Sequence, residues 1–242
     1  MNKPRPKACI LVIGNEILSG RTQDKNVNYI AKKLTELGVD LELVIMIPDV
    51  ISVIVKRLNE VRKVYDFVFT TGGIGSTHDD LTIEAVAKAF NKNLKTSPQV
   101  FDLLEEYYKG RGAEFNQARQ RMAVFPEGAE LIDNSITKAP GCYIENVFVF
   151  AGVPDIMRAM FDAIAHKIKG GDKIISRTYE AKIAENEIAD RLTIIAKKHP
   201  KVDIGSYPQI IDKEFAVAIV CRSDDEHLLD LIEPEIKGLL LL

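Results

Sequence analysis

The apolar residues of the first ninety positions alternate between two spacings, and this alternation restricts the chain to one class of fold. Residues 8–13 form a continuous apolar run, typical of a strand buried on both faces, and residues 41–47 and 67–71 are predicted as the second and third strands. Three other segments have apolar residues at helical spacing: Val27, Ile30, Ala31, Leu34 and Leu37; Ile51, Ile54, Val55, Leu58 and Val61; Ile83, Val86, Ala87 and Phe90. Strands and helices in this order predict an α/β fold with a mostly parallel sheet.

The middle of the chain is less regular. Ser97 and Pro98 are the expected N-cap and first residue of a helix through Tyr108. A second helix is expected over residues 114–122, ended by Pro126. Further along we expect a hairpin whose strands are residues 141–144 and 147–151. A helix over residues 156–168 is expected to follow it.

Gly170 and Gly171 form the clearest internal boundary. We therefore expect a first domain over residues 1–170 and a small α+β domain over residues 171–242. The strands of the second domain are expected near residues 173–183, 202–206 and 215–222, and its helices over residues 188–196 and from about 225.

Charge and composition exclude several classes of partner. The net charge is −3 and the pI is near 5.9, so we expect no binding to nucleic acid or to a membrane. The second domain has ten Lys and Arg against fourteen Asp and Glu, and it lacks the G-x-x-G loop of an RNA-binding KH domain. Cys9, Cys142 and Cys221 lie far apart in apolar stretches, which favours buried thiols in a cytoplasmic protein.

Residues 70–82, TTGGIGSTHDDLT, place three glycines between a predicted strand and a predicted helix. Gly72, Gly73 and Gly75 would let backbone N–H groups approach a phosphate, next to a helix N-terminus that favours anions. Ser76 and Thr77 follow in the same loop. The stretch is neither a Walker A loop nor a Rossmann fingerprint, so a purely structural turn stays open as an alternative.

Asp79 and Asp80 follow the glycines, and two carboxylates beside a phosphate need a cation between them. Hard oxygen ligands of this kind suit Mg²⁺. The alternative for Asp80 is a helix N-cap, and for Asp79 a solvated charge. His78 is either a proton donor or an exposed loop residue. Thr82 either contributes to the site or only begins the helix.

Two other predicted strands end in polar residues at the same edge of the sheet. Asn15 and Glu16 follow the first strand, and Asp49 follows the second. Taken alone, Asp49 is best explained as an N-cap. Because parallel strands bring their carboxyl ends to one edge, the three groups together indicate a site there.

Five segments resemble the MoaB/Mog molybdopterin-binding family, and more narrowly the amino-terminal domain of CinA-type competence/damage-inducible proteins and the related domain of eukaryotic FAD synthase. They are GNEILSGRTQDKN at 14–26, residues 70–90, AVFPEGAELIDN at 123–134, APGCYIEN at 139–146 and AGVPDIMRAMF at 151–161. The resemblance covers most of residues 8–168 and implies a three-layer α/β/α fold. The sequence IGSYPQ at 204–209 is similar to the KH-like middle domain of that group. The deamidase domain of full-length CinA has no counterpart, so we expect that activity to be absent.

The resemblance also implies roles for individual residues. Asp80 and Asp49 fall on positions expected to be catalytic or metal-associated. His78 is a candidate proton donor because of its place in the loop, and not because of the resemblance. The residues expected to bind the substrate are Gly72, Gly73, Gly75, Ser76, Thr77, Asn15, Glu16, Thr82, Pro140, Gly141, Gly152 and Pro154. Asn15 stands where many members have Asp, and Ser76 where many have Pro. The amide oxygen of Asn15 can still bind a cation or a ribose hydroxyl, so both roles stay open for residue 15.

The residues and the resemblance together leave three functions open. The first is a metal-dependent nucleotide pyrophosphatase that cleaves ADP-ribose or FAD-like dinucleotides, with a divalent cation on Asp79 and Asp80. The second is binding and adenylylation of molybdopterin. The third is a non-catalytic module for a pterin or nucleotide, because a fold does not determine a function. The family also implies a homo-oligomer.

Overall fold

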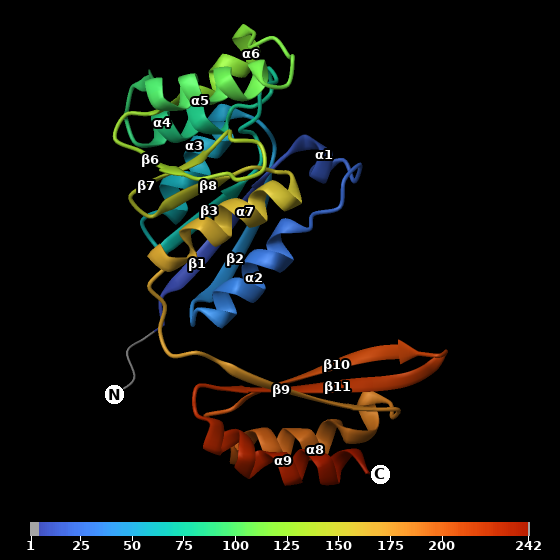
Figure 1. The fold of residues 1–242 in the computed structure, drawn as a ribbon. Coiled ribbons are helices and arrows are strands. Elements are labelled where there is room, and N and C mark those ends of the chain that lie inside the picture. Colours follow the sequence, from blue (N-terminus) through green and yellow to red (C-terminus); the bar gives the residue numbers. More distant parts are fainter. Residues whose placement is uncertain (1–4, 242) are drawn as a thin grey trace. The chain divides into compact units, whose positions relative to one another are not determined.

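The structure is a computed structural model that describes residues 5–241, and it divides the chain into two compact units (Figure 1). The first unit is Met1–Gly171 and the second is Asp172–Leu242. Along the chain, the first unit ends at Gly171, one residue after the boundary expected from the sequence.

The first unit is built on a six-stranded sheet in the order β2-β1-β3-β8-β7-β6. The strands in this order are β2 (Asp40–Ile47), β1 (Lys7–Ile13), β3 (Phe67–Thr71), β8 (Val147–Phe150), β7 (Gly141–Ile144) and β6 (Glu130–Ile132). Strands β2, β1, β3 and β8 are parallel, whereas β7 and β6 join in antiparallel pairs. The mostly parallel sheet and the β7–β8 hairpin expected from the sequence are confirmed.

Helices cover both faces of this sheet (Figure 1). Side chains of successive β1 residues alternate between two cores: Cys9 and Leu11 pack on one side, Ile10 and Val12 on the other. The first core includes residues of α3 (Ile51–Val61), α4 (Thr82–Ala89) and α5 (Pro98–Lys109); the second includes residues of α2 (Asn26–Glu36) and α7 (Pro154–Ile164). The three-layer α/β/α architecture is therefore confirmed.

The connection between α5 and β6 differs from expectation. Instead of one helix over residues 114–122, it contains α6 (Gln117–Gln120) and a 3₁₀ turn, η1 (Arg121–Ala123). The Asn116 side chain accepts a hydrogen bond from Arg119 N, so it caps the helix there and residues 114–116 stay outside it. The expected Ser97 cap is present, since its hydroxyl accepts from Val100 N. Short elements complete the unit: α1 (Asn15–Leu18), β4 (Leu94–Thr96), β5 (Val124–Pro126) and η2 (Ala165–Lys167).

The second unit is a three-stranded antiparallel sheet, in the order β10-β11-β9, with two helices. Its elements are β9 (Ile175–Ala181), α8 (Glu185–Lys198), β10 (Asp203–Ile211), β11 (Glu214–Ser223) and α9 (Glu226–Leu240). Apolar residues of both helices and the sheet form one core, which includes Ile188, Ile219 and Leu229. The expected α+β composition is confirmed, although β10 is longer than predicted.

All three cysteines are free and buried, as expected. Burial raises the pKa of the Cys9 and Cys142 thiols to about 12, so they stay protonated and unreactive at neutral pH. Across residues 5–241, no helix is long and apolar enough to cross a membrane.

Candidate functional site

A cavity of about 550 Å³ opens at the carboxyl edge of the parallel strands, in the size range of small-molecule sites. Ile13, Gly72 and Ala151 lie at the ends of β1, β3 and β8 and line it. The lining residues are Ile13, Glu16, Thr22, Asp49, Gly72, Gly73, Ile74, Gly75, Ser76, Thr77, Asp79, Asp80, Tyr108, Met122, Asn134, Thr137, Ala139, Ala151, Gly152, Val153, Pro154, Ile156 and Met160. Ligands of open α/β sheets bind at such an edge.

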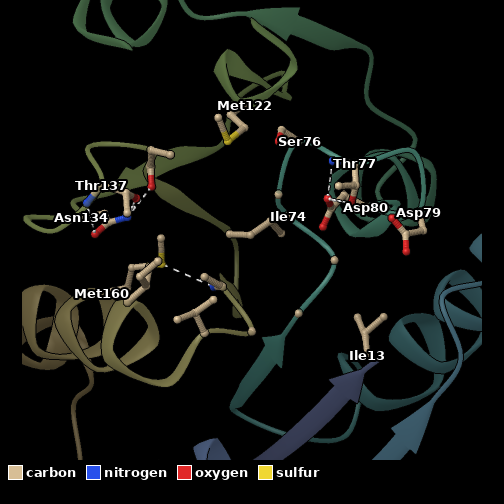
Figure 2. Close-up of a pocket in the computed structure, with 18 of the residues that line it drawn as sticks. Ile13, Ile74, Ser76, Thr77, Asp79, Asp80, Met122, Asn134, Thr137 and Met160 are labelled. Carbon is tan, nitrogen blue, oxygen red and sulfur yellow. Dashed lines mark hydrogen bonds between the residues drawn. The ribbon is translucent and has the colours of Figure 1, made fainter. Parts of the chain in front are cut away.

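The lining includes two chemically different regions. The acidic wall is Glu16, Asp49, Asp79 and Asp80 together with the glycine loop, residues 72–77. The second wall is Tyr108, Met122, Asn134, Thr137 and Ala139 with residues 152–154. In the view of Figure 2 the glycine loop runs between the two aspartates and the side chains of Asn134 and Met160.

The glycine loop requires glycine for two separate reasons. Gly72 and Gly73 have φ of 100° and 68°, which side chains disfavour. A Cβ on Gly72 would also lie 2.1 Å from the carbonyl oxygen of Ile13, so the loop runs directly against β1. The Thr82 hydroxyl donates to Gly72 O at 2.9 Å. Thr82 is fully buried and does not line the cavity, so its observed role is to hold the loop, not to meet a ligand.

Asp80 closes the end of the loop. Its Oδ2 accepts hydrogen bonds from Thr77 N at 2.7 Å and Thr77 Oγ1 at 2.6 Å (Figure 2). The N-cap of α4 is Leu81 and no side chain caps that helix, so the N-cap alternative for Asp80 is wrong. Among the hydrogen bonds of the described residues, none reaches Oδ1, and this oxygen can accept a cation.

Asp79 and His78 differ in their positions. Asp79 lines the cavity, and the nearby Thr77 hydroxyl and its own backbone N–H lower the pKa of its carboxyl, so it is charged at neutral pH. His78 is exposed and is not among the lining residues. The geometry therefore favours the exposed-loop alternative for His78 over a proton donor.

Asp49 connects the first two strand ends. Its Oδ2 accepts from Asn15 N at 2.7 Å, and the N-cap of α3 is Val50, so the N-cap explanation of Asp49 is also wrong. Its Oδ1 lies 3.5 Å from where a Cβ of Gly73 would stand, next to the glycine loop. Glu16 lines the cavity, whereas Asn15 contributes only this backbone contact.

The second wall contains some of the residues expected there. Gly152 and Pro154 line the cavity, and the buried Asn26 donates from Nδ2 to Gly152 O at 2.8 Å. Pro140 instead lines a small recess behind the glycine loop. Gly141 is buried in β7, where a Cβ would lie 2.4 Å from Val149 O, so close sheet packing explains this glycine.

Most of the second wall was not predicted from the sequence, and Asn134 is the clearest case. It is 1% exposed. Its amide donates to Thr137 Oγ1 and Ala139 O, and its carbonyl accepts from Ile136 N and Thr137 N. A turn signal was available, because Asn commonly bonds to backbone two or three residues on. No comparable signal marked Tyr108 or Met122 as lining residues.

Across the described part of the chain, the charged side chains that line the cavity are all acidic. Four carboxylates line the cavity, and no Lys or Arg does so among the residues the structure describes. Within residues 5–241 no three His, Cys, Asp or Glu side chains form a metal cluster. Mg²⁺ commonly uses one or two carboxylates and completes its shell with phosphate oxygens and water. Asp79 and Asp80 fit that donor set. Two carboxylates do not make a complete site from protein ligands alone.

Comparison with known proteins follows the same division into two units. A family model described as a probable molybdopterin binding domain matches residues 9–169, and one described as the FAD synthase middle domain matches residues 173–241. A protein of Archaeoglobus fulgidus is 37% identical over 200 residues, which cover 83% of this chain and 85% of that protein.

Two further relatives connect the chain to named proteins. A probable FAD synthase of Caenorhabditis elegans is 28% identical over 260 residues, which cover 98% of this chain and 50% of that protein. This chain therefore corresponds to about half of that relative. The crystal structure of CinA from Thermoplasma acidophilum matches with a TM-score of 0.62 and 29% identity, and covers 67% of this chain and 97% of that chain. The chain thus belongs to the family of probable molybdopterin-binding domains, with CinA among its structural relatives.

Proposed function

We propose that this protein is a divalent-metal-dependent nucleotide pyrophosphatase that cleaves ADP-ribose or FAD-like dinucleotides at the phosphoanhydride. The observation that carries the proposal is the acidic wall. It combines four carboxylates with a glycine loop suited to phosphate, and no lining Lys or Arg of the described residues neutralises them. A pyrophosphate can approach such a surface only together with cations.

In this scheme the residues around the cavity have separate roles. Asp80 Oδ1 and the Asp79 carboxylate would hold the cation, which when bound neutralises the pyrophosphate charge. The Gly72 N–H already donates to Phe150 O at 3.1 Å, so the phosphoryl group would come close to the loop at Gly73, whose φ is 68°. Asp49 has one oxygen fixed by Asn15 N, and its other oxygen would orient the attacking water. His78, exposed and outside the lining, has no step in this scheme.

The relatives support this substrate class. FAD contains a pyrophosphate between riboflavin and adenosine, and one relative is named a probable FAD synthase. The match of residues 173–241 to the FAD synthase middle domain supports the same class. A nucleotide with a flat ring would also suit the second wall, where Tyr108, Met122 and Ala139 present apolar surface.

Molybdopterin is the second candidate ligand, because the matching family model is described as a probable molybdopterin binding domain. A pterin with a terminal phosphate would use the same two walls. The protein would then either adenylylate that phosphate or bind the pterin without turnover.

Product analysis tests the proposal. Purified protein is incubated with ADP-ribose, FAD, NAD or ATP and Mg²⁺, Mn²⁺ or Co²⁺, and the products are separated by chromatography. We expect AMP from ADP-ribose or FAD, its loss in Asp80→Ala, and its retention in Asp102→Ala, an exposed carboxylate of α5 outside the cavity. No turnover of any dinucleotide would contradict the proposal, and an assay with molybdopterin and ATP would then separate the two other functions.

A further inference from the structure

One peptide group of the glycine loop is held from both sides by charged side chains. The carbonyl of Ser76 accepts a hydrogen bond from Arg121 Nη2 at 2.7 Å, and the N–H of Thr77 donates to Asp80 Oδ2 at 2.7 Å. These two groups belong to the same peptide bond. In a trans peptide they point in opposite directions, so a guanidinium and a carboxylate lie on either side of it.

Arg121 comes from a distant part of the chain. It lies in η1, 45 residues after Ser76, in the irregular connection that was expected from the sequence to be helical. With Gly75, Thr77 and Asp80 it lines the small recess behind the glycine loop, and it does not line the main cavity. The recess shares Gly75, Thr77 and Asp80 with the main cavity, so Arg121 borders the glycine loop without being among the residues that line the space where a ligand would bind.

We propose that Arg121 is a positioning residue that fixes the Ser76–Thr77 peptide and, through it, the orientation of the Asp80 carboxylate. With Oδ2 held by Thr77, Oδ1 of Asp80 remains available on the acidic wall. A hydrogen-bonded series that begins with a cation and ends with an anion strengthens each of its bonds. The contribution of Arg121 to turnover rests on the proposed function, whereas its hold on the loop does not.

The chemistry of the side chain explains why arginine suits this position. The guanidinium is planar and always charged, and it presents five N–H donors in a fixed geometry. A lysine could donate to Ser76 O, but as a flexible point charge it would fix the peptide plane less well. We therefore expect Arg121→Lys to retain part of the function and Arg121→Gln to lose more of it.

Amide hydrogen exchange tests the hold on the loop without any assay of activity. A hydrogen bond to a charged group changes the equilibrium constant for local opening by roughly ten- to a hundredfold. Exchange at Thr77 N–H should therefore be about tenfold faster in Arg121→Gln. Arg111→Gln is the matched control, since the Arg111 side chain is exposed, stacks on Tyr107 and is not among those that line the cavity. Unchanged exchange at Thr77 in Arg121→Gln, with the fold intact by the unfolding midpoint, would overturn the proposal.

Kinetics on the dinucleotide that is cleaved test the consequence for turnover. Arg121→Gln should lower kcat by about tenfold or more and change KM by less than about threefold, because Arg121 does not line the main cavity. Arg121→Lys should lie between this variant and the wild type. A raised KM with unchanged kcat would show that Arg121 binds the ligand directly and would overturn the positioning role. If no dinucleotide is cleaved, the proposed function fails, and the exchange at Thr77 still decides the role of Arg121.

Discussion

The two walls of the cavity are built by different means. The acidic wall comes from loops that leave β1, β2 and β3, and hydrogen bonds between these loops, such as Asn15 N to Asp49, hold it. Most of the second wall comes from the connection between α5 and β7, which has little regular structure and depends on side chains such as Asn134. We infer that the acidic wall carries the chemistry and the second wall selects the ligand.

The walls meet at two glycines. A Cβ on Gly152 would lie 3.2 Å from Gly72 Cα, so the glycine loop packs directly against the start of the second wall. Substitutions on either side of this junction should therefore have separable effects. Those in the acidic wall should lower kcat, and those in the second wall should raise KM.

Gly72→Ala should have the largest effect, because it combines an unfavourable φ with a clash against the Ile13 carbonyl. We expect a loss of about 2–4 kcal/mol in the free energy of unfolding and loss of turnover. Urea unfolding measures the change in the free energy of unfolding. Gly128→Ala is the matched control, since Gly128 has φ of 85° but no atom within 4 Å of its Cβ position, and it should cost only about 1 kcal/mol. Equal costs would show that the glycine loop does not pack tightly against β1.

Asp80→Asn should come next, and its largest effect should be on kcat. The Asn side-chain oxygen can still accept from Thr77 N–H, so the loop keeps its shape while the charge is removed. We expect kcat to fall by at least about 100-fold with no large change in unfolding free energy. Steady-state kinetics at several Mg²⁺ concentrations measures it. Full activity in this variant would show that turnover does not depend on the charge of the acidic wall at Asp80.

Asn134→Ala tests the second wall. Asn134 is almost fully buried, and its side-chain oxygen accepts from the N–H groups of Ile136 and Thr137. The change to alanine leaves both N–H groups without this acceptor. We expect about 1–3 kcal/mol of destabilisation and a KM raised by about tenfold, with kcat changed less than KM. A fall in kcat at constant KM would contradict the assignment of ligand selection to this wall.

High pH should act on the sheet below both walls and not on the walls themselves. Burial raises the pKa of Cys9 and Cys142 from 9.0 to about 12, so above pH 9 the unfolded chain releases protons that the folded chain retains. The free energy of unfolding is therefore constant with respect to these thiols below pH 9 and falls as the pH rises toward 12. Urea unfolding at pH 8 and pH 10.5 measures the fall, and Cys142→Ala should reduce it. An equal fall in that variant would assign the effect to other groups.

The acidic wall was largely predictable from the sequence, because its residues follow buried parallel strands. Once residues 8–13, 41–47 and 67–71 are strands, their ends must meet at one edge. Local patterns could not separate a cap from a loop contact, so Asp49 and Asp80 also fitted N-caps that the structure assigns to Val50 and Leu81. The partners of these carboxylates, Asn15 N and Thr77, are set by tertiary packing.

The second wall was harder to predict because no periodicity marks it. Met122 and Tyr108 are apolar residues like many in the core, and only the fold shows that they face a cavity. Conversely, Gly141 and Thr82 were assigned to the site, but the structure gives them packing and loop-holding roles. The resemblance to a known family located both walls in the chain and correctly assigned Gly152 and Pro154, but it also assigned Pro140 and Gly141, which do not line the cavity.

Calorimetric titration of ADP-ribose into the protein, with Mg²⁺ or with EDTA, tests the role of the acidic wall most directly. Four carboxylates without a lining cation among the described residues should repel the pyrophosphate. We therefore predict at least tenfold weaker binding in EDTA, roughly the effect of one charge interaction near a surface, and loss of this difference in Asp80→Asn. Equally tight binding with and without the metal would contradict a metal-dependent role for the acidic wall.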